Sequence, residues 1–188
     1  MARRKHFLTL AALAAMGAVL VNLIAGCASP DDEPTRTAES SSSARAFESD
    51  EEALAAATEA FADYQDTSDA ILADSGDRPE RLLRVATKDV YEIQLEGYEQ
   101  IAADGFHSVG HSKFDTVSLQ SANLFGGVGA VVIYLCADIS GTDIRDQKNR
   151  SVVRAGRLER WPLQLTFDYV DSRLLLSDQS DWSGDDFC

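Results

Sequence analysis

Residues 130–139, Ala-Val-Val-Ile-Tyr-Leu-Cys-Ala-Asp-Ile, are the stretch that decides the fold of this chain. In a strand, successive side chains point to opposite faces, so Val131 and Ile133 share one face while Val132 and Tyr134 share the other. Both faces are therefore largely apolar. A short run of this kind is typical of a strand that is buried on both sides. We expect it to lie in the centre of a sheet.

Further strands are expected on either side of this central one. In the longest of them, residues 161–170, Leu163 and Phe167 fall on one face and Gln164 falls on the other. The remaining strands are expected over residues 106–120, 152–153 and 173–177, with turns at 125–129, 140–143 and 171–172. The turn at 125–129 contains three glycines, but a strand and not a helix follows it, so it does not predict a phosphate-binding loop.

Three helices are predicted before the first strand, over residues 50–73, 79–86 and 87–103, because apolar residues recur there at steps of three and four. Ser49 followed three residues later by Glu52 is a capping-box pattern at the start of the first helix. Pro79 suits the first turn of the second helix, and Gly105 is expected to end the third. Helices followed by an antiparallel meander predict an α+β domain with the helices packed on one face of a curved sheet.

This order of elements, together with the stretch Trp-Pro-Leu-Gln-Leu-Thr-Phe-Asp-Tyr-Val at residues 161–170, resembles the nuclear-transport-factor-2-like, or cystatin-like cone, fold. The resemblance covers residues 50 to about 182 and implies a cone with a pocket between helices and sheet. Members of that group include ketosteroid isomerases, polyketide cyclases and scytalone dehydratases, and also non-catalytic exported domains of conjugation machinery and of actinobacterial envelope proteins.

The first 27 residues have the layout of an export signal. Arg3, Arg4 and Lys5 precede an apolar run, and small residues come before Cys27. The stretch Leu-Ile-Ala-Gly-Cys at residues 23–27 resembles the lipobox of bacterial lipoproteins. The resemblance implies a diacylglycerol thioether on Cys27, cleavage before this residue, and anchoring at the extracytoplasmic face of the cell membrane. An uncleaved membrane-spanning helix is the alternative, since a run of about 18 residues is just long enough to cross a bilayer.

Export by the general secretory route is favoured over the twin-arginine route, because the residues after Arg3 and Arg4 depart by one position from the twin-arginine spacing. Residues 28–49 contain two prolines, a serine run and acidic residues but few apolar ones, which predicts a flexible tether. The chain is thus divided into a signal peptide at residues 1–27, the tether at 28–49, and a single α+β domain at 50–188.

The charge of the chain excludes one class of partner. The net charge is −14 and becomes −17 once residues 1–27, which hold three basic and no acidic residues, are removed. Such a surface repels nucleic acid, and no cluster of lysine and arginine interleaved with aromatic residues offsets the repulsion. The expected partners are the membrane, through the lipid anchor, and an envelope protein or a small apolar ligand.

The cysteines predict a disulfide. With Cys27 modified by lipid, Cys136 and Cys188 are left as a pair in a compartment where disulfides persist. Joining them would close a loop of 52 residues and stabilise the domain by about 4 kcal/mol in the chain-entropy model. Two free thiols are the alternative.

No catalytic, metal or cofactor site is predicted. His107 and His111 have the spacing of metal ligands on a helix, but on a strand they would lie about 13 Å apart, too far to share an ion. The acidic residues of the C-terminal tail do not follow the EF-hand spacing. In a cone, acid–base chemistry would need an acid or histidine near a tyrosine in the pocket. The side chains available for this are Tyr64, Tyr91, Tyr98, Tyr134, Asp138 and Asp168.

Two functions are therefore expected to compete. The favoured one is a non-catalytic binding or scaffolding domain on an envelope lipoprotein, which predicts a pocket without a titratable pair. The alternative is a small anchored isomerase or lyase, which predicts a buried acid or histidine within hydrogen-bond reach of a tyrosine. Homodimerisation through the exposed face of the sheet is left open by polar positions such as Gln164, Thr166 and Asp168.

Overall fold

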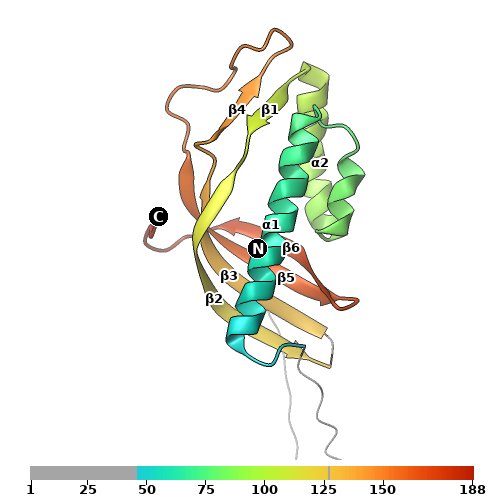
Figure 1. The fold of residues 1–188 in the computed structure, drawn as a ribbon, viewed down its shortest axis with the longest axis vertical. Helices are drawn as coiled ribbons and strands as arrows, with labels where there is room; N and C mark the ends of the chain where they lie inside the picture. Colours follow the sequence, from blue (N-terminus) through green and yellow to red (C-terminus); the bar gives the residue numbers. More distant parts are fainter. Residues whose placement is uncertain (1–45, 127) are drawn as a thin grey trace, which may run out of the picture. The chain divides into compact units, whose positions relative to one another are not determined.

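The computed structural model describes residues 46–126 and 128–188, which form helices and antiparallel sheets (Figure 1). The predicted signal peptide, Cys27 and residues 28–45 of the predicted tether lie outside the described residues. Within the described part, no helix is both long enough and apolar enough to cross a membrane.

Helix α1 spans Asp50–Ala73 and begins where the capping pattern predicts. The Ser49 hydroxyl accepts a hydrogen bond from the Glu52 amide at 3.1 Å, and the Glu52 carboxylate accepts one from the Glu48 amide at 2.6 Å. These contacts satisfy amide groups that have no partner within the helix. One stripe of α1 is buried, and it consists of Ala53, Ala57, Phe61, Tyr64 and Ile71.

A short 3₁₀ helix, η1, spans Pro79–Arg84, and helix α2 spans Lys88–Asp104. Gly105 ends α2 in the left-handed conformation with φ of 66°. A Cβ at this position would collide with the side chain of Gln147, which comes from a distant loop. Because the Gln147 side chain is flexible and can move aside, glycine is favoured at this position chiefly for its backbone angle.

The main sheet has four antiparallel strands in the order β2-β3-β5-β6, and a separate pair is formed by β1 and β4. The strands are β1 (His107–Gly110), β2 (Lys113–Phe125), β3 (Val128–Asp138), β4 (Thr142–Arg145), β5 (Arg160–Val170) and β6 (Arg173–Asp181). The strand predicted to be central is β3, which pairs with β2 on one side and with β5 on the other. That prediction is confirmed.

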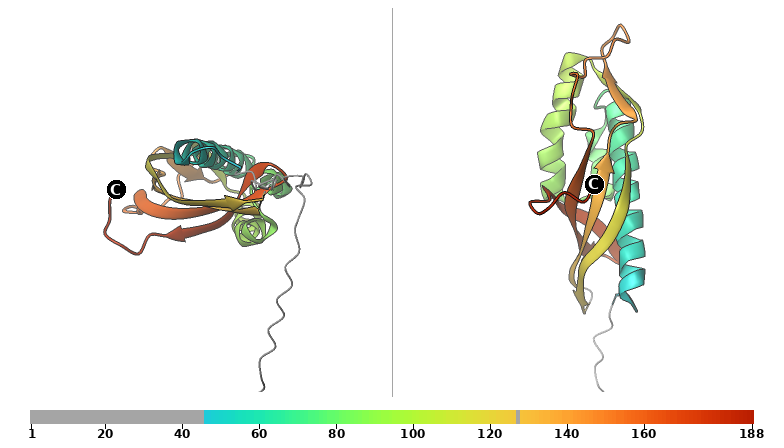
Figure 2. Two further views of the ribbon diagram at one scale, coloured as in Figure 1. Left: turned by 90° about the horizontal axis from the view of Figure 1, so that it is seen from below. Right: turned by 90° about the vertical axis from the view of Figure 1, so that its left-hand side faces the viewer.

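The face of the sheet that packs against α1 is called the inner face below. Its core positions alternate along the strands as expected: Val131, Ile133 and Leu135 on β3, and Leu163, Leu165 and Phe167 on β5, are at most 3% exposed. These residues form one cluster with the buried stripe of α1. Figures 1 and 2 show α1 running along this face, with the β1–β4 pair beyond its C-terminal half. The α+β class, with helices on a twisted antiparallel sheet, is thus confirmed.

Two bulges explain why residues 106–120 alternate only partly. The pairing of β2 with β3 shifts between Asp115 and Ser118 and again between Leu119 and Ser121. Each extra residue reverses the side-chain alternation beyond it. The positions packed on the core are consequently spaced by three and two residues in turn, and they are Phe114, Val117, Leu119, Ala122 and Leu124.

Three predicted strands need correction. Residues 106–120 are not one strand, because a break after Gly110 separates β1 from β2. Val152 and Val153 form no strand, and only the preceding Ser151 makes an isolated bridge, to Arg145. β6 continues to Asp181, beyond the predicted end at 177, because β5 offers paired positions as far as Leu163.

Candidate functional site

A cavity of about 310 Å³ lies between α1, the inner face of the sheet and the β1–β4 pair. Its apolar walls include Phe61, Leu72, Ile139, Ile144 and Leu163. Polar side chains enter from α1, from α2, from the segment around β1 and from the approach to β5; among them are Tyr64, Ser68, Asp69, Ser112 and Arg157. This is where the cone resemblance implies a pocket.

Asp69 is the acidic group of this cavity, and it is hydrogen-bonded to Ser112. Its two carboxylate oxygens accept hydrogen bonds from the Ser112 amide at 2.8 Å and from the Ser112 hydroxyl at 2.9 Å. His111 approaches the same carboxylate at 4.0 Å, but its own side chain is 85% exposed. The arrangement ties α1 to the segment between β1 and β2, so Asp69 acts as a structural clasp.

Two tyrosines near the cavity keep their protons. Burial raises the pKa of Tyr64 strongly, and the nearby Tyr98 adds to the shift. Burial also raises the pKa of Tyr98, while its hydrogen bond with Ser68 at 2.8 Å opposes this rise. Within the described residues, the Tyr64 hydroxyl has no hydrogen-bond partner and Tyr64 lines the cavity. A phenol in this state can donate a hydrogen bond to a ligand oxygen or nitrogen.

Arg157 borders the cavity but is occupied by the backbone. One guanidinium nitrogen donates to the carbonyl oxygens of Ile139, at 2.8 Å, and Thr142, at 2.5 Å. The Nε atom is buried, without a hydrogen-bond partner in the described part, and lies 3.7 Å from a carboxylate oxygen of Glu159. Arg157 therefore fixes the irregular chain before β5 against the turn that precedes β4.

The other acid and tyrosine candidates lie outside the cavity. Tyr134, Asp138 and Asp168 belong to the outer face of the sheet, which is the face opposite α1. Tyr134 contacts the Trp182 ring, with 4.7 Å between centroids, and Asp168 accepts a hydrogen bond from the Ser177 hydroxyl at 3.0 Å. Tyr91 is half-buried on α2 and packs at the edge of the core. Across the described residues, no carboxylate is hydrogen-bonded to a tyrosine.

His107 lies on β1 and His111 lies in the loop that follows it. The described residues contain no group of three or more His, Cys, Asp or Glu side chains arranged to hold a metal ion. Of the acidic tail, Asp178 and Asp181 belong to β6, while Asp185 and Asp186 lie beyond it.

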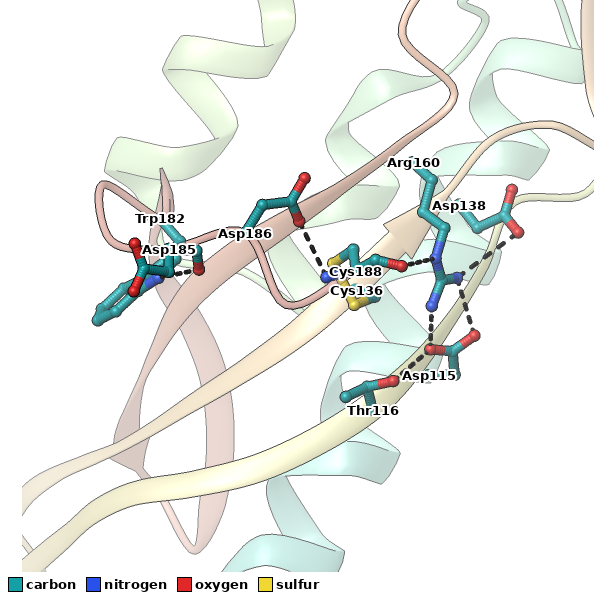
Figure 3. Close-up of a disulfide and its surroundings, with 9 residues drawn as sticks. All are labelled: Asp115, Thr116, Cys136, Asp138, Arg160, Trp182, Asp185, Asp186 and Cys188. Atoms are coloured by element: carbon teal, nitrogen blue, oxygen red, sulfur yellow. Dashed lines mark hydrogen bonds and ion pairs between the residues drawn. A yellow bond between two sulfur atoms is a disulfide. The ribbon is translucent and has the colours of Figure 1, made fainter.

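The predicted disulfide is present. Cys136 on β3 is joined to Cys188, with 5.6 Å between their Cα atoms (Figure 3). Cys136 points to the outer face and yet is 0% exposed, because the tail that follows β6 crosses over it. Figure 2 shows this tail on the side of the sheet away from α1.

Beside the disulfide, Arg160 links several segments. Its guanidinium forms a two-pronged ion pair with Asp115 on β2, lies 3.8 Å from Asp138 on β3, and donates to the Cys188 carbonyl at 3.3 Å (Figure 3). The hydrogen bonds from Arg160 and from the Thr116 hydroxyl lower the pKa of Asp115 to about 2. The tail that follows β6 is thus held at both ends: the disulfide fixes Cys188, and the packing of Trp182 fixes the other end.

Sequence reasoning missed Asp69, Ser112, Arg157 and the Arg160–Asp115 pair. Asp69 and Ser112 are 43 residues apart, and Asp115 and Arg160 are 45 residues apart. No local pattern joins them, because the contact is created by the packing of α1 on the sheet and by strand register.

Comparisons with known proteins bear on the fold alone. No family model matches the chain, and no curated protein matches it. The backbone is similar to the crystal structure of the intermembrane space region of the chloroplast protein ARC6, with a TM-score of 0.50 and 14% sequence identity. The match covers 70% of this chain and 97% of that chain. At this identity the likeness supports the α+β architecture and carries no function.

Proposed function

We propose that this protein is a lipoprotein, anchored through Cys27 at the extracytoplasmic face of a bacterial cell membrane, whose nuclear-transport-factor-2-like cone binds a small, mainly apolar ligand without transforming it. The tether of residues 28–49 would hold the cone clear of the lipid surface. The disulfide between Cys136 and Cys188 supports an oxidising compartment.

The observation that carries the proposal is the state of the cavity groups. Asp69, the carboxylate lining the cavity, is held in place by two hydrogen bonds from Ser112, and the tyrosines have raised pKa values that keep them neutral. A general base needs a lone pair directed at the substrate and a pKa near the working pH. What the cavity offers instead is apolar walls and one unpaired phenol, Tyr64. These groups suit a neutral ligand with a single hydrogen-bond acceptor.

The anchored isomerase or lyase is the second candidate. Its support is the charge of Asp69, which contributes to the raised pKa of Tyr98. The two groups make no hydrogen bond with each other in the described structure. No acid–base pair is therefore assembled in the described cavity, and so we favour binding.

Binding to the apolar walls can be tested with N-phenyl-1-naphthylamine, a neutral and mainly apolar fluorescent probe. We expect its emission to rise in the presence of the folded domain. Leu72→Trp, which fills the cavity, should abolish the rise, whereas Leu83→Trp, on the exposed side of η1, should leave it intact. Equal binding by both variants would refute the cavity as the ligand site.

The lipid anchor needs its own experiment. Mass spectrometry of the membrane fraction should find acyl mass on a mature N-terminal peptide that begins with Cys27. A Cys27→Ser variant should remain unprocessed. If the variant is still cleaved before residue 27 and its N-terminal peptide still carries acyl mass, the lipoprotein proposal is wrong.

A further inference from the structure

A second hollow, of about 580 Å³, lies between the start of β5 and the tail that follows β6. We call it the tail groove. Leu158, Trp161, Pro162 and Trp182 contribute apolar surface, and Asp181 and Asp186 belong to its rim. Leu158 is 68% exposed, so its side chain is available to a partner that enters the groove.

The walls of the tail groove are held by contacts within this chain. The Trp182 amide donates to the Pro162 carbonyl at 3.1 Å, and the Trp182 ring packs on Tyr134. Its indole nitrogen donates to the Asp185 carbonyl at 3.1 Å, and Cys188 is fixed to Cys136 (Figure 3). A wall held at both ends loses little conformational entropy on binding, so it favours affinity.

Negative charge predominates around the tail groove. One guanidinium, that of Arg160, has the carboxylates of Asp115, Asp138 and Asp186 near it, and Asp181 and Asp186 line the groove itself. Arg160 is already committed to Asp115, so the exposed acids of the tail have no cation of their own in the described residues. The whole chain is also strongly acidic, with net charge −14, and its field would attract a cationic partner.

We propose that the tail groove docks a basic, extended peptide segment of a partner protein, in which lysine or arginine alternates with an apolar residue. The apolar side chains would cover Leu158, and a cationic side chain would lie over the Trp182 ring or against the acids of the rim. An anionic lipid surface or an acidic peptide would meet repulsion at every one of these acids. This inference does not depend on what the inner cavity binds.

The probe for the test is the peptide acetyl-Lys-Leu-Lys-Leu-Lys-amide, with acetyl-Glu-Leu-Glu-Leu-Glu-amide as its charge-reversed counterpart. Binding to the disulfide-bonded protein is measured by isothermal titration calorimetry at physiological ionic strength. We expect the lysine peptide to bind and the glutamate peptide not to bind. Stronger binding of the glutamate peptide, or of vesicles rich in anionic lipid, would overturn the proposal.

Matched variants separate docking in the groove from general attraction by an acidic protein. Asp181→Asn with Asp186→Asn removes two charges at the rim, and Glu96→Gln with Glu99→Gln removes two exposed charges on α2. The rim pair should weaken binding about tenfold, since each exposed ion pair contributes modestly, and the α2 pair less than twofold. Equal losses in the two pairs would show that the groove is not the site.

Trp182→Ala tests the contribution of the indole ring to the tail groove. Cys188→Ser tests the contribution of the disulfide that fixes the end of the tail. Each should weaken binding of the lysine peptide, Trp182→Ala by about fivefold through the lost cation–π contact. Circular dichroism and urea unfolding establish that each variant is folded under the conditions of the titration. Unchanged affinity in both folded variants would exclude the tail groove as the docking site.

Discussion

The two faces of the sheet are closed in different ways. On the inner face, Val131, Leu165 and Phe167 are each 0% exposed and belong to one apolar cluster with the buried stripe of α1. On the outer face, Cys136 is equally buried, but a seven-residue tail covers it, held by a disulfide, an aromatic contact and the Arg160 ion pairs. Apolar packing does not depend on redox state or on pH. The disulfide depends on redox state, and the ion pairs depend on pH.

The difference indicates which conditions can loosen each face of the sheet. A helix of 24 residues brings enough apolar surface to hold itself in place. The polar tail does not, because Ser183, Gly184, Asp185 and Asp186 have little to bury. We therefore expect the closure of the outer face to weaken when the disulfide is reduced, and four predictions follow from the contrast between the two faces.

The largest effect is expected from the inner face. Phe167→Ala removes a fully buried ring beneath α1 and should lower the free energy of unfolding by about 3–5 kcal/mol. The control is Thr166→Ala, one residue along β5 on the outer face, which should change it by about 0.5 kcal/mol or less. Urea unfolding followed by circular dichroism measures both. Similar losses in the two variants would contradict the division into a packed and an unpacked face.

The disulfide should come next. Cys188→Ser opens a loop of 52 residues and should cost about 2–4 kcal/mol of unfolding free energy. Wild-type protein unfolded in the presence of dithiothreitol should match the variant, and the variant should not respond to the reductant. If reduction leaves the urea midpoint of wild type unchanged, the tail does not stabilise the outer face.

A smaller effect is expected at the start of α1. Ser49→Ala removes the oxygen that accepts from the Glu52 amide and should cost about 1 kcal/mol. Ser49→Asp retains a capping oxygen and should stay close to wild type. An equal loss in both variants would show that the serine acts through something other than the cap.

The smallest effect is expected from the Arg160–Asp115 pair, because the carboxylate is exposed to solvent. Arg160 holds the pKa of Asp115 at about 2, below the unfolded value of about 3.9. A depressed pKa in the folded state stabilises the protein above pH 4, and this contribution disappears as the pH falls from 4 to 2. The urea midpoint of wild type should drop more over that interval than the midpoint of Asp115→Asn.

The comparison between Asp115 and an unpaired acid sharpens this test. Asp171→Asn lies in the turn between β5 and β6, where its carboxylate makes no ion pair within the described structure. This variant should follow the wild-type pH dependence. A flat wild-type response between pH 4 and pH 2 would mean that Arg160 does not stabilise the outer face.

Much of the fold was predictable because it follows local patterns. The capping residues at the start of α1, the glycine that ends α2 and the two-sided apolar run of β3 each act within a few residues. β2 was predicted less well, since two bulges reset its alternation and bulges leave no clear composition signal. The strand predicted at Val152 and Val153 is absent because the contact of this segment with β4 is limited to the Arg145–Ser151 bridge and one hydrogen bond from the Val152 amide to the Ile144 carbonyl, which is too short to form a ladder.

The sequence by itself determined the α+β class, the central position of β3 and the pairing of Cys136 with Cys188, because side-chain periodicity and an even count of cysteines act without knowledge of distant contacts. Only the tertiary structure decided that Asp69 is tied to Ser112, that Tyr64 lines the cavity unpaired, and that the tail forms a groove beside Leu158. These outcomes depend on strand register and on how α1 crosses the sheet. Such long-range geometry is set by the packing of the whole core and is not encoded in any single stretch.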